Sequence, residues 1–125
     1  MKIRMRNTIQ FDEQLEVVDQ LYDVEVREKG DYSYLLFYNE EKEKVVLKFH
    51  EEELVMTRFS SPKTIMRFLK EAASLAYIPT PMGVQEFIIQ TSHYQVDQQM
   101  IELAYQLQNK EGNPFADYRL EITWG

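Results

Sequence analysis

Two arginine side chains are the residues of this chain whose surroundings suggest the binding of an anion. Arg58 alternates in phase with the apolar Met56, and Arg67 alternates in phase with Ile65 and Leu69. If these faces point into the fold, each guanidinium group needs a negative partner, because an unpaired buried cation is strongly unfavourable. Two interpretations stay open: an ion pair with an acidic residue of the chain, or a bond to the carboxylate of a ligand. The acidic residues considered for such an ion pair are Asp19, Glu86 and Glu121.

The sequence contains no comparable pattern for catalysis or for metal binding. The two histidines, His50 and His93, are far apart and neither belongs to a His-x-His motif, so we interpret both as surface residues. No serine occupies a Gly-x-Ser-x-Gly elbow, and no glycine-rich phosphate loop is present. The absence of cysteine excludes disulfides and thiolate ligands. We therefore expect a protein that is not an enzyme, with no catalytic residues, no metal site and no cofactor.

The overall charge narrows the choice of partners. Lysine and arginine number 14 against 21 acidic residues, which gives a net charge of −7. Such a surface repels phosphate backbones and anionic lipids. No stretch approaches the roughly 18 consecutive apolar residues of a membrane-spanning helix, and no apolar signal core follows the first six residues. We expect a cytoplasmic protein whose partners include neither nucleic acid nor membrane.

Short stretches of alternating apolar and polar residues run through most of the chain. Val45, Leu47 and Phe49 form one of them, and charged or glycine-containing turns such as 28–31 and 109–114 separate them. With 44% hydrophobic and 13% aromatic residues, a chain of 125 residues can bury a packed core. The pattern predicts one all-β domain over residues 1–125, folded as an antiparallel up-and-down barrel of about eight to ten strands.

The segment 62–75 is ambiguous on local evidence. Apolar residues with helical spacing, preceded by Ser61 as an N-cap and Pro62 in the first turn, favour a helix. Ile65 and Leu69 also lie on one face of a strand that would continue the preceding hairpin. Both structures stay open from the residues alone.

Three features together resemble a known family. They are the turn Thr80-Pro81-Met82-Gly83, the Ala76-Tyr77 approach to it, and the closing segment 118–124. The chain resembles the YwiB-like family of small bacterial proteins, whose fold is similar to the calycins, the lipocalin-type β-barrels. An aromatic residue usually occupies the position of Met82 in that family, so the likeness implies no ring-mediated binding at this turn. The resemblance implies that residues 65–69 form a strand, and it carries no catalytic residue over to this chain.

These observations lead to two hypotheses of function. The first is a non-enzymatic barrel that binds a small, partly apolar molecule, which can be anionic, in its lumen. Arginines would hold the polar end and aromatic side chains would line the wall. The residues expected to bind the ligand are Arg58, Arg67, Tyr34, Phe49, Phe87 and Tyr118.

The alternative hypothesis is a protein-interaction module with a solid barrel core. Its patch would consist of Leu35, Phe37 and Val55, if these residues lie opposite the core face. The protein would be a monomer or a homodimer.

Overall fold

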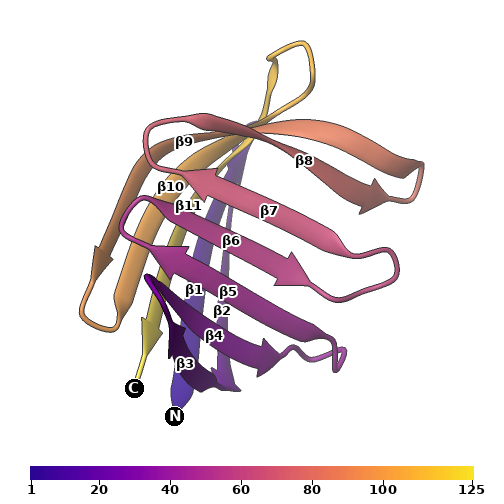
Figure 1. Ribbon diagram of the computed structural model, residues 1–125. Coiled ribbons are helices and arrows are strands. Elements are labelled where there is room, and N and C mark those ends of the chain that lie inside the picture. Colours follow the sequence, from indigo (N-terminus) through magenta and orange to yellow (C-terminus); the bar gives the residue numbers. More distant parts are fainter.

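The structure of residues 1–125 is a computed structural model in which two antiparallel sheets contain all of the strands (Figure 1). The strands follow from the period-two pattern, which places alternate side chains on the core and solvent faces. In β10 (Met100–Gln108), for example, Leu103, Tyr105 and Leu107 are buried while the residues between them are partly exposed.

The larger sheet has six strands in the order β2-β1-β11-β10-β9-β8. Besides β10, these strands are β1 (Lys2–Phe11), β2 (Gln14–Asp23), β8 (Ala73–Thr80), β9 (Gly83–Asp97) and β11 (Pro114–Trp124). The smaller sheet has five strands in the order β3-β4-β5-β6-β7. They are β3 (Glu25–Lys29), β4 (Tyr32–Tyr38), β5 (Lys44–His50), β6 (Glu53–Arg58) and β7 (Thr64–Leu69).

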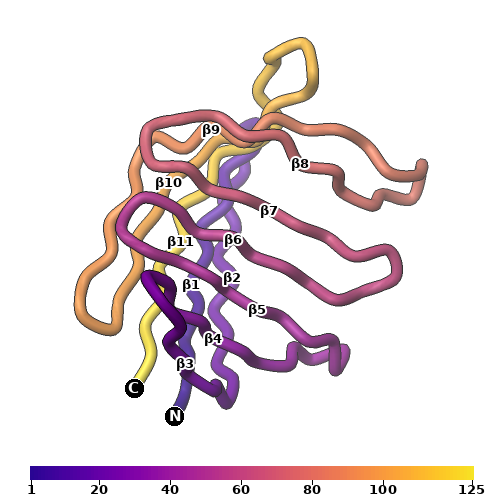
Figure 2. Tube along the Cα trace, in the orientation of Figure 1, coloured from indigo at the N-terminus to yellow at the C-terminus, as the bar shows by residue number.

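The chain path is that of an up-and-down barrel interrupted at two places. Every neighbouring pair within a sheet is consecutive in sequence, except that β11 returns beside β1. Ile3 lies opposite Trp124 in that ladder, so the two termini lie side by side (Figure 2). No ladder joins β2 to β3 or β7 to β8. The predicted all-β, antiparallel fold is confirmed, but the two sheets do not close into a barrel, and the strands number eleven.

A side-chain hydrogen bond spans the opening between β7 and β8. The hydroxyl of Ser74 donates a hydrogen bond to the carbonyl of Arg67, in place of a backbone amide. The amide of Thr91 on β9 donates to the carbonyl of Ala72 at 3.2 Å. The first bond connects β8 to β7 through a side chain, and the second continues the β8–β9 pairing by one residue, while no ladder joins β7 to β8.

Residues 64–69 form a strand, as the family resemblance implied. The strand pairs with β6 from Arg58 opposite Thr64 to Glu53 opposite Leu69. Phe68 is buried and Ile65 is exposed, which fits strand alternation. The hydrogen-bonding edge of β6 thus overrides the helical spacing of the apolar residues, because propensity is a weaker influence than pairing and burial.

Aromatic side chains join the two sheets across a filled interior. Phe49 of β5 meets Trp124 of β11 with ring centroids 5.5 Å apart. Phe68 of β7 meets Tyr105 of β10 at 4.7 Å. The hypothesis that Leu35 and Phe37 form an exposed patch is wrong, because both side chains are buried in this core. Val55, on the opposite face, is only partly exposed.

No helix of the structure has the length and apolar character needed to cross a membrane.

Candidate functional site

The two arginines expected to share a site lie on opposite faces of the smaller sheet. Arg58 ends β6 on the core side, at the rim, where its Nε is 3.8 Å from a carboxylate oxygen of Glu43. Arg67 lies on the outer face of β7, and its Nε is 2.9 Å from a carboxylate oxygen of Glu53. Both therefore have structural ion pairs, and Arg67 does not enter the interior.

The four aromatic residues expected around a ligand are also separated. Phe49 is buried against Trp124, and Tyr118 stacks on Tyr105 with ring centroids 4.6 Å apart. Phe87 is only partly buried, and Tyr34 faces outwards on β4, beside the buried Leu35. The six predicted residues thus do not surround one cavity, because the core rings that would line it pack against one another.

A surface groove between β7 and β8 is the concave site that best combines apolar and charged groups. Its volume is about 720 Å³, and it opens to solvent along the interrupted edge. Its lining residues come from the two strands and the turn before β7: Lys63, Ile65, Arg67, Leu69, Ala73, Ser74, Leu75, Ala76 and Tyr77.

The groove owes its apolar character to outward-facing residues of the two strands. Ile65 is 44% exposed, Leu75 is 56% exposed and Tyr77 is 58% exposed. Leu75 lies opposite Ile88 in the β8–β9 ladder, so apolar side chains continue onto the neighbouring strand. Three large side chains are thus open to solvent around one concave site, whereas isolated exposed apolar residues are ordinary.

Arg67 gives the groove its positive charge. The Arg67 side chain is about half exposed, and its ion pair with Glu53 is made through Nε. No side-chain hydrogen bond within the protein uses its two terminal nitrogens, so a fork of N–H donors remains for an anion. Lys63 adds a second positive charge at the end of the groove, with Nζ 5.6 Å from the Phe59 ring.

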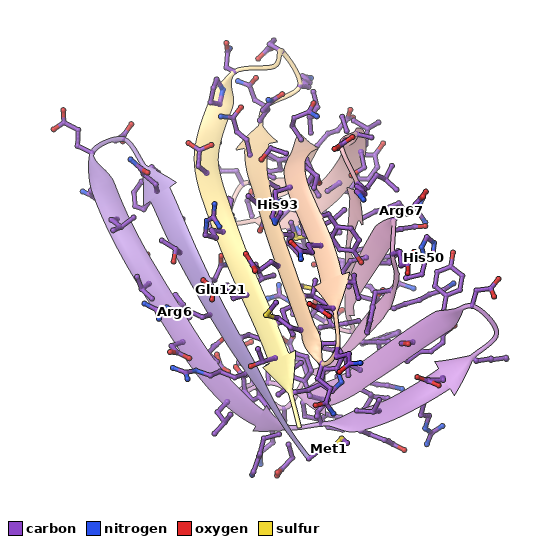
Figure 3. The ribbon with its side chains drawn as sticks, turned by 90° about the vertical axis from the view of Figure 1, so that its left-hand side faces the viewer. Met1, Arg6, His50, Arg67, His93 and Glu121 are labelled. Carbon is purple, nitrogen blue, oxygen red and sulfur yellow. The ribbon has the colours of Figure 1, made fainter.

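The histidines do not form part of this groove. Figure 3 shows His93 over the larger sheet, in the region of Arg6 and Glu121, whereas His50 and Arg67 lie at the side with the smaller sheet. Nδ1 of His50 accepts a hydrogen bond from the amide of Glu52 at 3.0 Å. No group of three or more histidine, aspartate or glutamate side chains is placed to hold a metal ion.

Comparison with known proteins settles the family. The model described as "Domain of unknown function (DUF1934)" matches residues 3–122. The chain belongs to this family. The crystal structure of the ywiB protein from Bacillus subtilis is similar to this DUF1934 chain, with a TM-score of 0.80 and 22% identity, over 99% of this chain and 90% of that chain. The predicted membership of the YwiB-like family is therefore confirmed, and at this identity the likeness shows the fold alone. A search among curated proteins found no match.

The groove of this DUF1934 chain was only partly visible in the sequence. The sequence shows that Arg67, Ile65 and Leu69 share one face of a strand, but it does not show whether that face points to the core or to the groove. Leu75 ends the segment whose structure was ambiguous, and Tyr77 belongs to the Ala76-Tyr77 approach to the turn; neither position carried a signal of exposure. The burial of Phe68 assigns one face of β7 to the core, and the face that carries Arg67 therefore points outwards.

Proposed function

We propose that this DUF1934 protein is a non-enzymatic, cytoplasmic binding protein whose β7–β8 groove holds a small, partly apolar molecule with an anionic group. The observation that carries the proposal is the position of Arg67 between exposed apolar side chains in one concave site. Its volume lies in the range of roughly 300–1,000 Å³ that is usual for small-molecule sites. The proposed binding site is therefore the groove at the outer edge of the sheets, and not the barrel lumen expected from the sequence.

The chemistry of the groove selects an amphipathic anion. A ligand with an apolar body would cover Ile65 and Leu75. Each Å² of apolar surface that is removed from water contributes about 25 cal/mol to the free energy of binding. The free terminal nitrogens of Arg67 suit a carboxylate or sulfonate, which can accept two parallel hydrogen bonds. Glu53 stays bound to Nε and holds the guanidinium group in place.

Titration with the fluorescent anion anilinonaphthalene sulfonate tests this site. We expect saturable binding that decanoate displaces, because both molecules join an apolar body to one negative charge. Arg67→Gln should weaken decanoate binding by about tenfold or more, since charge-assisted hydrogen bonds contribute roughly 1.5–3 kcal/mol. Leu75→Ser should weaken it through the loss of apolar contact.

Arg27→Gln is the matched control. Arg27 is also exposed and also paired with a neighbouring carboxylate, that of Glu25 on β3, but it lies outside the groove. Unchanged affinity in Arg67→Gln, or equal losses in Arg67→Gln and Arg27→Gln, would remove the basis for this assignment.

A protein partner is the second candidate for the same groove. It is favoured by the continuation of exposed apolar residues onto Val84 and Met82 at the tip of the β8–β9 hairpin. A peptide ligand would contact this tip, so Val84→Ser would weaken its binding while leaving decanoate affinity unchanged.

A further inference from the structure

Strand β2 forms a free edge of the larger sheet and carries exposed leucines. Leu15 is 67% exposed and Leu21 is 63% exposed, and both point to the outer face with Val17. β2 is the end strand of its sheet, and Figure 3 shows no strand paired beyond it, although its Gln20 and Tyr22 side chains contact Glu40 and, on β4, Phe37. A long free edge with apolar side chains is a template for pairing with another chain.

Two of the three other edge strands carry features that oppose such pairing, and the third, β7, has β8 beside it across the groove. β3 has only five residues, and its charged members include Glu25, Arg27 and Lys29. β8 contains Pro79, which cannot donate a ladder hydrogen bond. β2 has ten residues with neither proline nor lysine, and its Asp19 carboxylate is bound by Arg4 through hydrogen bonds of 3.0 and 2.7 Å.

The free backbone groups of β2 belong to the same odd-numbered residues that carry the exposed leucines. The amide of Val24 donates to the carbonyl of Met1 at 3.0 Å, one step beyond the Lys2–Asp23 pair of the β1–β2 ladder. Because hydrogen-bonded pairs alternate in an antiparallel ladder, the even-numbered residues of β2 bond to β1. The odd-numbered residues therefore direct their amides and carbonyls outwards, and no backbone hydrogen bond outside the ladders engages residues 14–23.

The sequence of β2 is complementary to itself about Val18. In an antiparallel pairing of two copies centred there, Leu15 of one copy faces Leu21 of the other on the outer face. Val17 faces Asp19, and no like charges lie opposite each other between residues 15 and 21. Centring the pair on Asp19 instead would place two aspartates face to face, which is unfavourable.

We propose that two copies of this protein associate through their β2 strands, antiparallel and two-fold symmetric about Val18. The outward amides and carbonyls of Leu15, Val17, Asp19 and Leu21 then complete a ladder that runs through both larger sheets. Each copy contributes the same surface, so the contact closes as a dimer. This edge is distinct from the β7–β8 groove, and neither proposal depends on the other.

Paired substitutions test the register by sedimentation equilibrium. The unaltered protein should reach twice the 15.0 kDa mass of one chain. L15K/L21K should be monomeric, because each new lysine faces another lysine. L15K/L21E should remain dimeric, since each new lysine then faces a new glutamate. A monomeric or openly polymerising parent protein overturns the proposal, as does a dimer that persists in L15K/L21K.

Leu75→Lys is the matched control for an added charge. Leu75 is exposed to a similar degree but lies on β8, away from the proposed contact, so this variant should stay dimeric. Loss of the dimer in Leu75→Lys would place the contact elsewhere and overturn the proposal.

Cysteine substitution gives a second readout that does not depend on the stability of charge variants. The chain has no cysteine, so a single introduced thiol reports without interference. Two Val18 residues would face each other as a non-hydrogen-bonded pair, with Cα atoms about 4.5 Å apart, within reach of a disulfide. Two Leu15 residues would lie about 20 Å apart. Val18→Cys should therefore cross-link at least tenfold faster than Leu15→Cys, and equal rates would contradict the register.

Discussion

Tyr22 of β2 and Phe37 of β4 stack across the first interruption between the sheets, with ring centroids 5.0 Å apart and planes 16° from parallel. The Tyr22 hydroxyl also donates to one carboxylate oxygen of Glu40, and the side-chain amide of Gln20 donates to the other oxygen at 3.1 Å. Side chains thus hold the sheets together where the strands do not pair. This contact and the groove at the second interruption show that the two openings are closed to different degrees.

Tyr22→Ala should lower the free energy of unfolding by about 2 kcal/mol, because it removes an aromatic pair and partly buried apolar area. Tyr22→Phe keeps the ring and should cost less than about 1 kcal/mol. Urea denaturation of both variants measures the difference. Tyr38→Ala, at an exposed tyrosine of β4 in the smaller sheet, should change little. Equal losses in Tyr22→Ala and Tyr22→Phe would contradict the role given to the ring.

Tyr94 ties β9 to the turn between β5 and β6. Its hydroxyl oxygen lies 2.6 Å from the carbonyl oxygen of His50 and 3.0 Å from that of Glu53. Tyr94→Phe removes the donor and should lower the free energy of unfolding by about 1–3 kcal/mol, because carbonyls in a partly buried site lose their partner. Tyr77→Phe, at an exposed hydroxyl, is the control in the same denaturation assay and should have no measurable effect.

Substitutions along β7 should show a period of two. Phe68→Ala should cost about 3–5 kcal/mol, because the ring is buried against Tyr105. Ile65→Ala, on the outer face, should cost less than about 1 kcal/mol. Thermal or urea denaturation measures both, and similar losses at the two positions would indicate that this segment does not present alternate faces.

Alkaline solution should destabilise the protein through its tyrosines. Burial is the main cause that raises the pKa of Tyr22, Tyr94, Tyr105 and Tyr118, and for Tyr22 the hydrogen bond to Glu40 adds to it. The unfolded chain releases these protons near the usual tyrosine pKa of about 10, whereas the folded chain retains them. The free energy of unfolding should therefore be insensitive to these groups below about pH 10 and should fall above it. Urea titrations across that range test this, and Tyr105→Phe should weaken the dependence.

Acid should remove a second, smaller contribution. The hydrogen bond from Arg4 is the main cause that lowers the pKa of Asp19, and the one from Lys2 does the same for Asp23. Each carboxylate therefore stabilises the fold above its unfolded pKa of about 4, and this contribution is lost as pH falls through the lowered folded value. Asp19→Asn should reduce the acid dependence of unfolding, and added salt should do the same because both pairs are exposed. If the free energy of unfolding of Asp19→Asn depends on acid as strongly as that of the unaltered protein, other groups cause the dependence.

The predicted binding residues show where sequence reasoning stopped. Alternation correctly grouped Arg67 with Ile65, and strand parity correctly separated Phe49 from its polar neighbours. Alternation is symmetric, however, so it does not say which of two faces meets the other sheet. For β4, the choice of Leu35 and Phe37 as the exposed face was wrong for that reason.

By itself the sequence determined the all-β class, the antiparallel succession of strands and the family, because period-two patterning and turn residues act locally. Tertiary structure decided that residues 64–69 pair with β6 as a strand, and that the sheets stay open beside β2 and between β7 and β8. It also decided that Arg67 faces a surface groove with Glu53 as its partner. These outcomes depend on hydrogen bonds and ring contacts between residues far apart in the chain, such as Thr91 with Ala72 and Phe68 with Tyr105, which no local pattern encodes.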